Sequence, residues 1–349
     1  MPFMTEKPQQ WDLRSIAMAC GGLCAGLIIA VSIVSTIVEI GYRFQWPDPH
    51  RSEFEAYNPN LDRTRQEPST VLALGDSFTA GASSWPSFLQ STLGKGRRVV
   101  NSGVGGTTIT HAQLIARRRL KRWTPRVVVF QTYIGNDLLD LRHPREAQGV
   151  GVVRRIYWWV IDSGAFAPWY LNHRAAALAS RRSFDPGRAA AAINAPFSVE
   201  QYSPRERRLS HVDPRHVERQ ILVEGTAMEA AWERYRRALD HLAERCRHNG
   251  ADLVILVVPH CIQAAPVYRD RFAALGAQWS DVDRLISSPT PFVTRVRQAL
   301  PSARVIDPLE AMQQAERDGL RLYSTNDPHL TPEGSALLGH VVFQAINID

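Results

Sequence analysis

Five short apolar runs, rich in valine and isoleucine, constrain the fold of this 349-residue chain more than any other feature. Each run is too short for a helix, and each is bounded by Gly, Pro, Asn or Asp, the residues that end strands. Several are apolar throughout, as expected for parallel strands that are covered on both faces. We therefore predict strands at residues 70–74, 97–100, 126–131, 252–258 and 304–306.

Helical patterns separate these runs. The clearest covers residues 224–248 and ends at Asn249-Gly250, a good C-cap, with the next strand two residues later. Its apolar face is formed by side chains at steps of three and four: Met228, Ala231, Trp232, Tyr235, Leu239, Leu242 and Cys246. This alternation of strands and helices predicts a doubly wound α/β fold, a three-layer sandwich around a five-stranded parallel sheet.

An uncharged apolar segment, residues 16–38, precedes this domain and is long enough to cross a bilayer as a helix. We expect a tail at 1–15 and an uncleaved transmembrane anchor at 16–40, because no small-residue cleavage site follows the segment. A cleaved signal peptide is the alternative. With the short tail in the cytoplasm, the rest of the chain is expected to be extracytoplasmic, for instance in the periplasm.

Two further segments have no clear period. Residues 41–68, rich in Pro, Asn, Asp and Arg, are expected to be a linker, so that the domain covers 69–349. An oversized interval between the third and fourth strands, at about 140–222, reads as an insertion. Insertions of this length are typically lids, substrate walls or disordered loops, and packing onto the main domain is the simplest interpretation.

The net charge of +7 does not indicate nucleic-acid binding. Of 41 basic residues only three are lysine, which suggests a coding bias spread over the surface, and no nucleic-acid-binding motif accompanies them. Cys246 and Cys261 are expected to be buried thiols, with a disulfide between them as the alternative. No zinc-ligand spacing and no dinucleotide fingerprint is present, so we expect no metal and no cofactor.

The candidate chemistry follows the strands, because ligands bind at the carboxyl ends of strands in open α/β sheets. The first strand leads to Gly75-Asp76-Ser77, the second to "NSGVGGTT" at 101–108 and the third to "YIGND" at 133–137. After the fifth strand the chain reaches "NDPHLTPEG" at 326–334. A serine, a glycine-rich turn, an asparagine and an Asp/His pair are therefore predicted to meet at one edge of the sheet.

This set of residues suits acyl transfer. A serine hydroxyl becomes nucleophilic when an imidazole takes its proton, and the imidazole needs an acceptor that fixes its tautomer. Backbone N–H groups and an asparagine amide are suitable donors to an oxyanion. We also expect Ser77 to begin a helix, whose positive end would face the oxyanion. A plain helix N-cap is the simpler interpretation of Ser77 when it is considered alone.

The four motifs resemble, in order, those of the SGNH hydrolase or GDSL esterase family over roughly residues 70–349. "GDSFT" is similar to the nucleophile block, "NSGVGGT" to the glycine block, "GND" to the asparagine block and "DPHLTPEG" to the histidine block. The resemblance implies the flavodoxin-like SGNH fold, with Ser77 as nucleophile and His329 as base. It also implies an oxyanion hole formed by Ser77, Gly106 and Asn136.

One spacing departs from the family. Its commonest pattern places an aspartate three residues before the histidine, where this chain has Asn326. Asp327, two residues before His329, is therefore assigned the orienting role, a spacing that some membrane-anchored and polysaccharide-modifying members share. Asn326 as a cap of the turn, another carboxylate as the acid, and a Ser–His dyad remain alternatives.

Three nearby residues are expected to be structural: Asp76 braces the turn, Asp137 holds its loop, and an isolated histidine such as His260 is more often structural than a residue that lines a site.

The resemblance implies a serine esterase that acts on small acyl esters, acetyl esters of carbohydrate or cell-envelope polysaccharide first among them. An O-acetyltransferase with the same residues is one alternative, and the motifs do not separate the two. A non-catalytic carbohydrate-binding or assembly protein is the other, and intact Ser77 and His329 speak against it.

Overall fold

A computed structural model describes residues 13–43, 50–59, 61, 71–94, 96–141 and 195–346. Its centre is one parallel five-stranded sheet in the order β2-β1-β3-β4-β5. The strands are β1 (Val71–Leu74), β2 (Val99–Asn101), β3 (Val127–Tyr133), β4 (Asp252–Val258) and β5 (Arg304–Ile306). Every side chain of β1, β2 and β3 is buried, which explains their uninterrupted apolar runs. The predicted strands are confirmed at their expected places.

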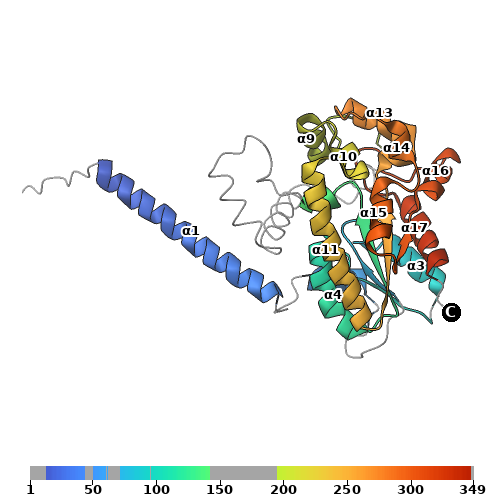
Figure 1. Ribbon diagram of the computed structural model, residues 1–349, viewed down its shortest axis with the longest axis horizontal. Helices are drawn as coiled ribbons and strands as arrows, with labels where there is room; N and C mark the ends of the chain where they lie inside the picture. The colour runs from blue at the N-terminus through green and yellow to red at the C-terminus, as the bar shows by residue number, and fades with distance from the viewer. Residues whose placement is uncertain are drawn as a thin grey trace, which may run out of the picture.

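Helices cover both faces of the sheet (Figure 1). On one face α3 (Trp85–Leu93) packs against α17 (Pro332–Ala345), and on the other α4 (Ile109–Trp123) packs against α11 (Thr226–His248), with α15 (Pro291–Ala299) beside α11. In the sheet, the step from β1 to β2 runs in the opposite direction to the step from β3 to β4. Because both crossovers are right-handed, their helices α3 and α11 lie on opposite faces of the sheet. The doubly wound prediction is confirmed, and the strand order reverses between β1 and β3.

The remaining helices of the described part are short. They are α2 (Arg51–Tyr57), α5 (Asp137–Leu141), α9 (Pro204–Val212), α10 (His216–Leu222), α12 (Cys261–Ala264), α13 (Pro266–Ala274), α14 (Val282–Ile286) and α16 (Leu309–Arg317). The long predicted helix is α11, and all the side chains of its predicted apolar face are buried. Cys246 and Cys261 are both buried and free, so the alternative of a disulfide between them is wrong.

Part of the expected linker belongs to the folded domain. Residues 51–58 form α2 and its C-cap, and the buried Phe54 ring of α2 lies 6.2 Å from the Trp123 ring, with the Arg119 guanidinium 3.6 Å from the Phe54 ring centroid. The sequence of α2 gave no helical period because one aromatic side chain, rather than an apolar stripe, attaches this short helix.

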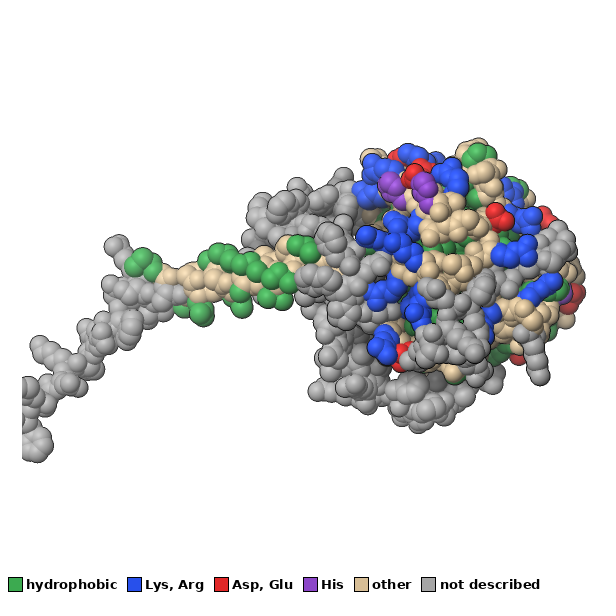
Figure 2. Space-filling view, turned by 90° about the horizontal axis from the view of Figure 1, so that it is seen from below, with side chains coloured by type: hydrophobic (Ala, Val, Ile, Leu, Met, Phe, Trp, Pro, Cys, Tyr) green, Lys and Arg blue, Asp and Glu red, His purple; other side chains and the backbone are tan. Residues whose placement is uncertain are grey.

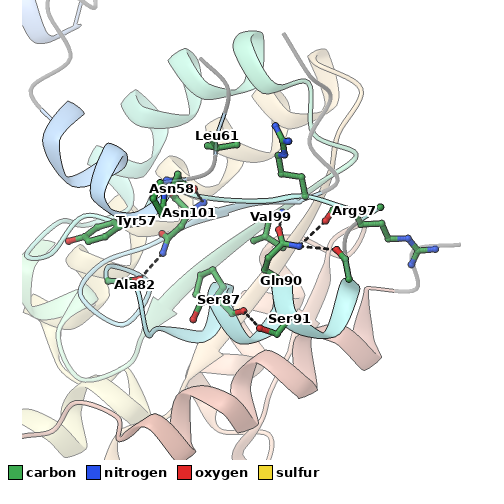
Figure 3. Close-up of a pocket in the computed structure, with 16 residues that line it drawn as sticks. Tyr57, Asn58, Leu61, Ala82, Ser87, Gln90, Ser91, Arg97, Val99 and Asn101 are labelled. Carbon is green, nitrogen blue, oxygen red and sulfur yellow. Dashed lines mark hydrogen bonds between the residues drawn. The ribbon is translucent and has the colours of Figure 1, made fainter. Parts of the chain in front are cut away.

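The free edge of β2 is capped by side-chain amides (Figure 3). Asn58 Oδ1 accepts a hydrogen bond from Asn101 N at 2.9 Å, and Asn58 Nδ2 donates to Asn101 O at 2.7 Å, as a neighbouring strand would. Gln90 Oε1 likewise accepts from Val99 N at 2.8 Å. A cavity of about 780 Å³ lies beside this edge, lined by residues that include Asn58, Tyr57 and Gln90. Side chains thus replace the missing strand partner of β2.

The insertion expected at 140–222 is described only from residue 195 onward, and residues 142–194 lie outside the described part. Helices α9 and α10 belong to its second half. The side chains of Val217, Ile221 and Leu222 in α10 join the buried core of the domain. The described part of the insertion therefore packs onto the main domain.

The N-terminal apolar segment is the helix α1 (Leu13–Arg43), within which residues 20–41 have the length and composition of a membrane span. Figure 2 shows hydrophobic side chains along this helix. Its large apolar side chains, such as Leu23 at 77% and Leu27 at 65%, are exposed, unlike those of a core helix. Most of the tail expected at 1–15 lies outside the described residues.

The edge cap of β2 predicts a stability effect. Asn58→Ala leaves the N–H and C=O of Asn101 without their partners, so we expect the free energy of unfolding to fall by about 1–3 kcal/mol. Chemical denaturation followed by circular dichroism measures this change. Gln344→Ala, at an exposed position of α17, is the control and should alter it by less than about 0.5 kcal/mol. Equal effects of the two variants would contradict the capping role.

Candidate active site

The reversal of strand order places the ends of β1 and β3 side by side, and the predicted motifs follow these two strands. Ser77 lies three residues after β1 and Asn136 three residues after β3. His329 arrives from the loop before α17, and its ring contacts Ser77 across 252 positions of sequence. Gly106 lies in an exposed turn after β2, and its approach to Ser77 remains a prediction.

Ser77, His329 and Asp327 form a continuous hydrogen-bonded line. Ser77 Oγ lies 2.8 Å from His329 Nε2, and the Asp327 carboxylate bonds to His329 Nδ1 through its Oδ1. An ionised carboxylate only accepts, so Nδ1 carries the proton and Nε2 of the neutral ring accepts from the serine hydroxyl. Asp327 Oδ1 also accepts from the His329 backbone N–H at 2.8 Å, which fixes the carboxylate relative to the ring. This tautomer is the one that general-base catalysis requires.

The pKa values of the two groups move apart in a way that favours this arrangement. Burial acts to raise the pKa of the Asp327 carboxyl, but the hydrogen bond from the His329 ring and the charge of that ring outweigh it and hold the pKa below its ordinary value. Burial likewise acts to lower the pKa of His329, but its bond to Asp327 and the charges of Asp327, Asp76 and Glu206 raise it above 6.5. Asp327 therefore remains ionised and holds the proton on Nδ1.

Ser77 does not begin a helix, so that expectation is wrong. It lies in a tight turn in which Asp76 O accepts from the backbone N–H groups of Thr79 at 3.1 Å and Ala80 at 2.9 Å. The next helix is α3, which starts at Trp85 after the N-cap Ser84. After the turn the chain contacts the second motif, where Asn101 Nδ2 donates to Thr79 O at 2.9 Å. With no helix at Ser77, the expected contribution of a helix dipole to the site is absent.

The turn that carries Ser77 is braced from β3. Gln131 Oε1 accepts from Asp76 N at 3.3 Å and from Thr79 Oγ1 at 2.9 Å. A Cβ on Gly75 would lie 2.4 Å from both Gln131 Oε1 and Thr79 Oγ1, so only glycine fits between these groups. Asp76 Oδ1 accepts from Phe78 N at 3.0 Å, which agrees with the bracing role expected for Asp76. Gln131 was not anticipated, because its side chain acts from the interior of a strand.

Two buried carboxyl groups hold the loop of Asn136. Asn136 Nδ2 donates one hydrogen bond to Asp76 Oδ2 at 3.2 Å, so its second amide N–H is available for another acceptor. Asp137 Oδ2 accepts from Tyr133 N at 3.0 Å and from the Thr132 hydroxyl. Burial raises the pKa of Asp76, and burial together with the charge of Asp76 raises that of Asp137 well above the ordinary value. Both carboxyls hold backbone, as expected.

An aromatic stack supports the His329 ring, and the sequence gave no signal for it. Phe78 stacks on His329 with ring centroids 4.9 Å apart and contacts Tyr133 at 4.1 Å, and Tyr133 stacks on His260 at 5.8 Å. A Cβ on Gly135 would lie 2.5 Å from the Tyr133 ring, so the glycine of the "GND" motif allows this packing. His260 is buried and its Nδ1 caps α12, and burial lowers its pKa to about 3. It is structural, as expected.

Comparisons with known proteins gave matches among solved structures only, and neither a protein-family model nor a curated protein matches this chain. TesA matches at 14% identity and a TM-score of 0.38, over 80% of this chain and 98% of TesA. A lipolytic protein of the G-D-S-L family from Desulfitobacterium hafniense matches at 12% identity and a TM-score of 0.39, over 80% of this chain and 99% of that protein. A catalytic mutant of Axe2, an acetylxylan esterase from Geobacillus stearothermophilus, matches at 12% identity and a TM-score of 0.41, over 82% of this chain and 98% of Axe2.

The hydrogen bond between Asp327 and His329 predicts a titration that nuclear magnetic resonance can measure. We expect the His329 imidazole of the full chain in detergent to titrate above 6.5, because the charged ring is stabilised by Asp327. Asp327→Asn removes this stabilisation and should lower the pKa of His329. His329→Ala assigns the signal by its loss. A pKa of His329 that is unchanged in Asp327→Asn would show that the two groups do not interact in solution.

Proposed function

We propose that this protein is a serine esterase of the SGNH type. Ser77 is the nucleophile, His329 the general base and Asp327 the residue that orients His329. The observation that carries the proposal is the 2.8 Å contact between Ser77 Oγ and His329 Nε2, with Nδ1 of the same ring on the Asp327 carboxylate. An aligned serine, histidine and aspartate of this kind activates a hydroxyl for attack on an acyl carbon.

The reaction proceeds in two steps of the same chemistry. His329 Nε2 takes the hydroxyl proton while Ser77 Oγ attacks the carbonyl carbon of the ester, and the resulting imidazolium gives this proton to the departing alcohol. The acyl group is then bound to Ser77. A water molecule, deprotonated by the same Nε2, attacks the acyl carbon. The bond from this carbon to Ser77 Oγ then breaks, the imidazolium returns the proton to Ser77 Oγ, and the acid is released. Asp327 stabilises the imidazolium in both steps without taking its proton.

We propose three donors for the oxyanion: the backbone N–H groups of Ser77 and Gly106 and the side-chain amide of Asn136. In the part of the chain that the structure describes, neither the Ser77 nor the Gly106 backbone N–H donates to a protein acceptor, and Asn136 has its second amide N–H. Each donor of such a set lowers the barrier by about 3 kcal/mol. Gly106 has φ 69°, a left-handed conformation that a residue with a side chain rarely adopts.

We assign acetyl esters of carbohydrate, including cell-envelope polysaccharide, as the substrate class. The side chains of His329 and Asp327 are 47% and 44% exposed. Because His329 protonates the leaving alcohol, its exposure supports an alcohol portion that is large and extends into solvent. The same exposure gives water access to the acyl-serine, which supports hydrolysis over transfer of the acetyl group to a second sugar.

The test of this function is the serine itself. Full-length protein in detergent should hydrolyse p-nitrophenyl acetate, and Ser77→Ala should lower kcat by at least about 10⁴-fold. A fluorophosphonate probe should label the wild type at Ser77 and leave Ser77→Ala unlabelled, whereas the control Ser91→Ala, on the exposed side of α3, keeps both properties. Unchanged turnover in Ser77→Ala would end the proposal. Release of acetate from acetylated xylan then tests the substrate class.

The proposed location is a membrane, with α1 as a single anchor and the catalytic domain outside the cytoplasm. The length and exposed apolar surface of α1 support an anchor. A reporter fused at the C-terminus that is active only outside the cytoplasm should be active, and the protein should stay in the membrane fraction after a carbonate wash. A cytoplasmic reporter signal contradicts the orientation, and a shortened soluble product identifies α1 as a cleaved signal sequence.

A further inference from the structure

Asn326 lies three residues before His329, where the family that this chain resembles usually carries an aspartate. Here its side chain binds another part of the chain. Asn326 Oδ1 accepts a hydrogen bond from Ser198 N at 2.9 Å, and Asn326 Nδ2 donates to Pro196 O at 3.0 Å. Asn326 O accepts from Ser203 N at 3.1 Å. The side chain is buried, at 9% exposure. An amide supplies both the donor and the acceptor that this backbone needs, whereas an ionised aspartate at the position could only accept.

The segment that Asn326 holds, residues 195–203, is where the chain returns from the insertion, and we name it the return segment. Its other side packs against α13: the Tyr202 ring meets the Phe272 ring edge-on at 5.5 Å, and the Arg271 guanidinium lies 5.9 Å from the Phe197 ring centroid. Arg271 Nη1 also donates to Thr325 O at 3.5 Å, beside Asn326. The return segment is therefore fastened between α13 and the loop that carries Asp327 and His329.

This loop needs such a support. The hydrogen bonds that the structure gives the Asp327 carboxylate all come from His329, and both side chains are nearly half exposed. At its base the loop is closed by Ser324 N, which donates to His329 O at 2.9 Å, and by the bridge between Tyr323 and Leu330. Between these points the loop is held by the bond from Arg271 to Thr325 O, by the stack of Phe78 on the His329 ring, and by the buried side chain of Asn326, the residue directly before Asp327.

We infer that Asn326 is a positioning residue for the proposed reaction: by fastening the loop to the return segment, it keeps the Asp327 carboxylate on Nδ1 of His329. This inference rests on the proposed esterase function. Loss of the amide removes both side-chain bonds of residue 326 to the return segment and leaves only the backbone bond from Ser203 N. The backbone at 326 is then held less firmly, and the half-exposed Asp327 carboxylate turns partly into water. The insertion thereby contributes to the geometry of the base, although its described part supplies none of the reacting groups.

The experiment compares Asn326→Ala with Asn58→Ala in the full chain in detergent. Both residues are buried amides whose side chains bond to backbone, in two bonds for Asn326 and three for Asn58, but Asn58 lies at the edge of β2. We expect Asn326→Ala to lower kcat about tenfold to a hundredfold with KM within about twofold, since a displaced catalytic group costs rate rather than binding. In Asn326→Ala, the acidic limb of the pH profile of kcat/KM should move to lower pH, and the pKa of His329 should fall. Asn58→Ala should lose stability only.

A wild-type kcat with an unchanged acidic limb of the kcat/KM profile in Asn326→Ala would overturn the inference. Equal losses of kcat in Asn326→Ala and Asn58→Ala would overturn it as well.

A second experiment moves the carboxylate from position 327 to position 326, in the double variant Asn326→Asp with Asp327→Asn. Because the side chain at 326 points at the return segment, kcat should stay at the level of Asp327→Asn alone, and recovery would show that position 326 reaches His329. If the wild type neither hydrolyses esters nor takes the fluorophosphonate label, the proposed function fails. The pKa of His329 in Asn326→Ala, measured by magnetic resonance, then still decides the role of Asn326.

Discussion

The burial of both faces of a parallel sheet is the constraint on which the rest of this structure depends. β1 and β3 are buried along their whole length, and their buried polar side chains, Gln131 and Thr132, lie toward the carboxyl end of β3. At the carboxyl ends the loops are packed against one another without spare room. A Cβ on Gly103 would lie 2.6 Å from Ala80 N, and one on Gly75 would meet Gln131. Only glycine fits where these loops touch, and the same packing brings the Asn136 amide onto Asp76, the residue directly before Ser77.

The acidic residues near the site divide into two environments with opposite effects on their pKa. Asp76 and Asp137 are buried, their pKa values are raised, and their oxygens accept bonds from the backbone at 78 and 133. Asp327 is half exposed, and its bonds to His329 lower its pKa. A carboxylate that must stay charged beside an imidazole is therefore placed near water, while those that hold the loops are placed in the core.

Helix α2 and the return segment hold parts of the chain in place and supply none of the proposed reacting groups. Helix α2 is joined to the domain by the Phe54 ring and by Asn58 on the edge of β2, so the chain between α1 and the domain is short. Six residues, 44–49, separate α1 from His50, a span of at most about 20–25 Å when extended. If α1 is an anchor, the site is held close to the membrane. The return segment is fastened in the same manner, by an asparagine side chain that bonds to backbone.

The sequence by itself determined the strands, the α11 helix and the residues that reach the carboxyl edge of the sheet. These depend on periodicity and on turn residues, which are local properties of the chain. The resemblance also indicated that Asp327, rather than the adjacent Asn326, binds His329, and the structure contains this hydrogen bond. Only the tertiary structure decided the role of Asn326, the placement of residues 51–58 and the absence of a helix at Ser77. Their partners lie far away in sequence: 128 positions separate Asn326 from Ser198, and 43 separate Asn58 from Asn101. Hydrogen bonds over such separations exist only once the sheet has brought the segments together, and no local pattern encodes them.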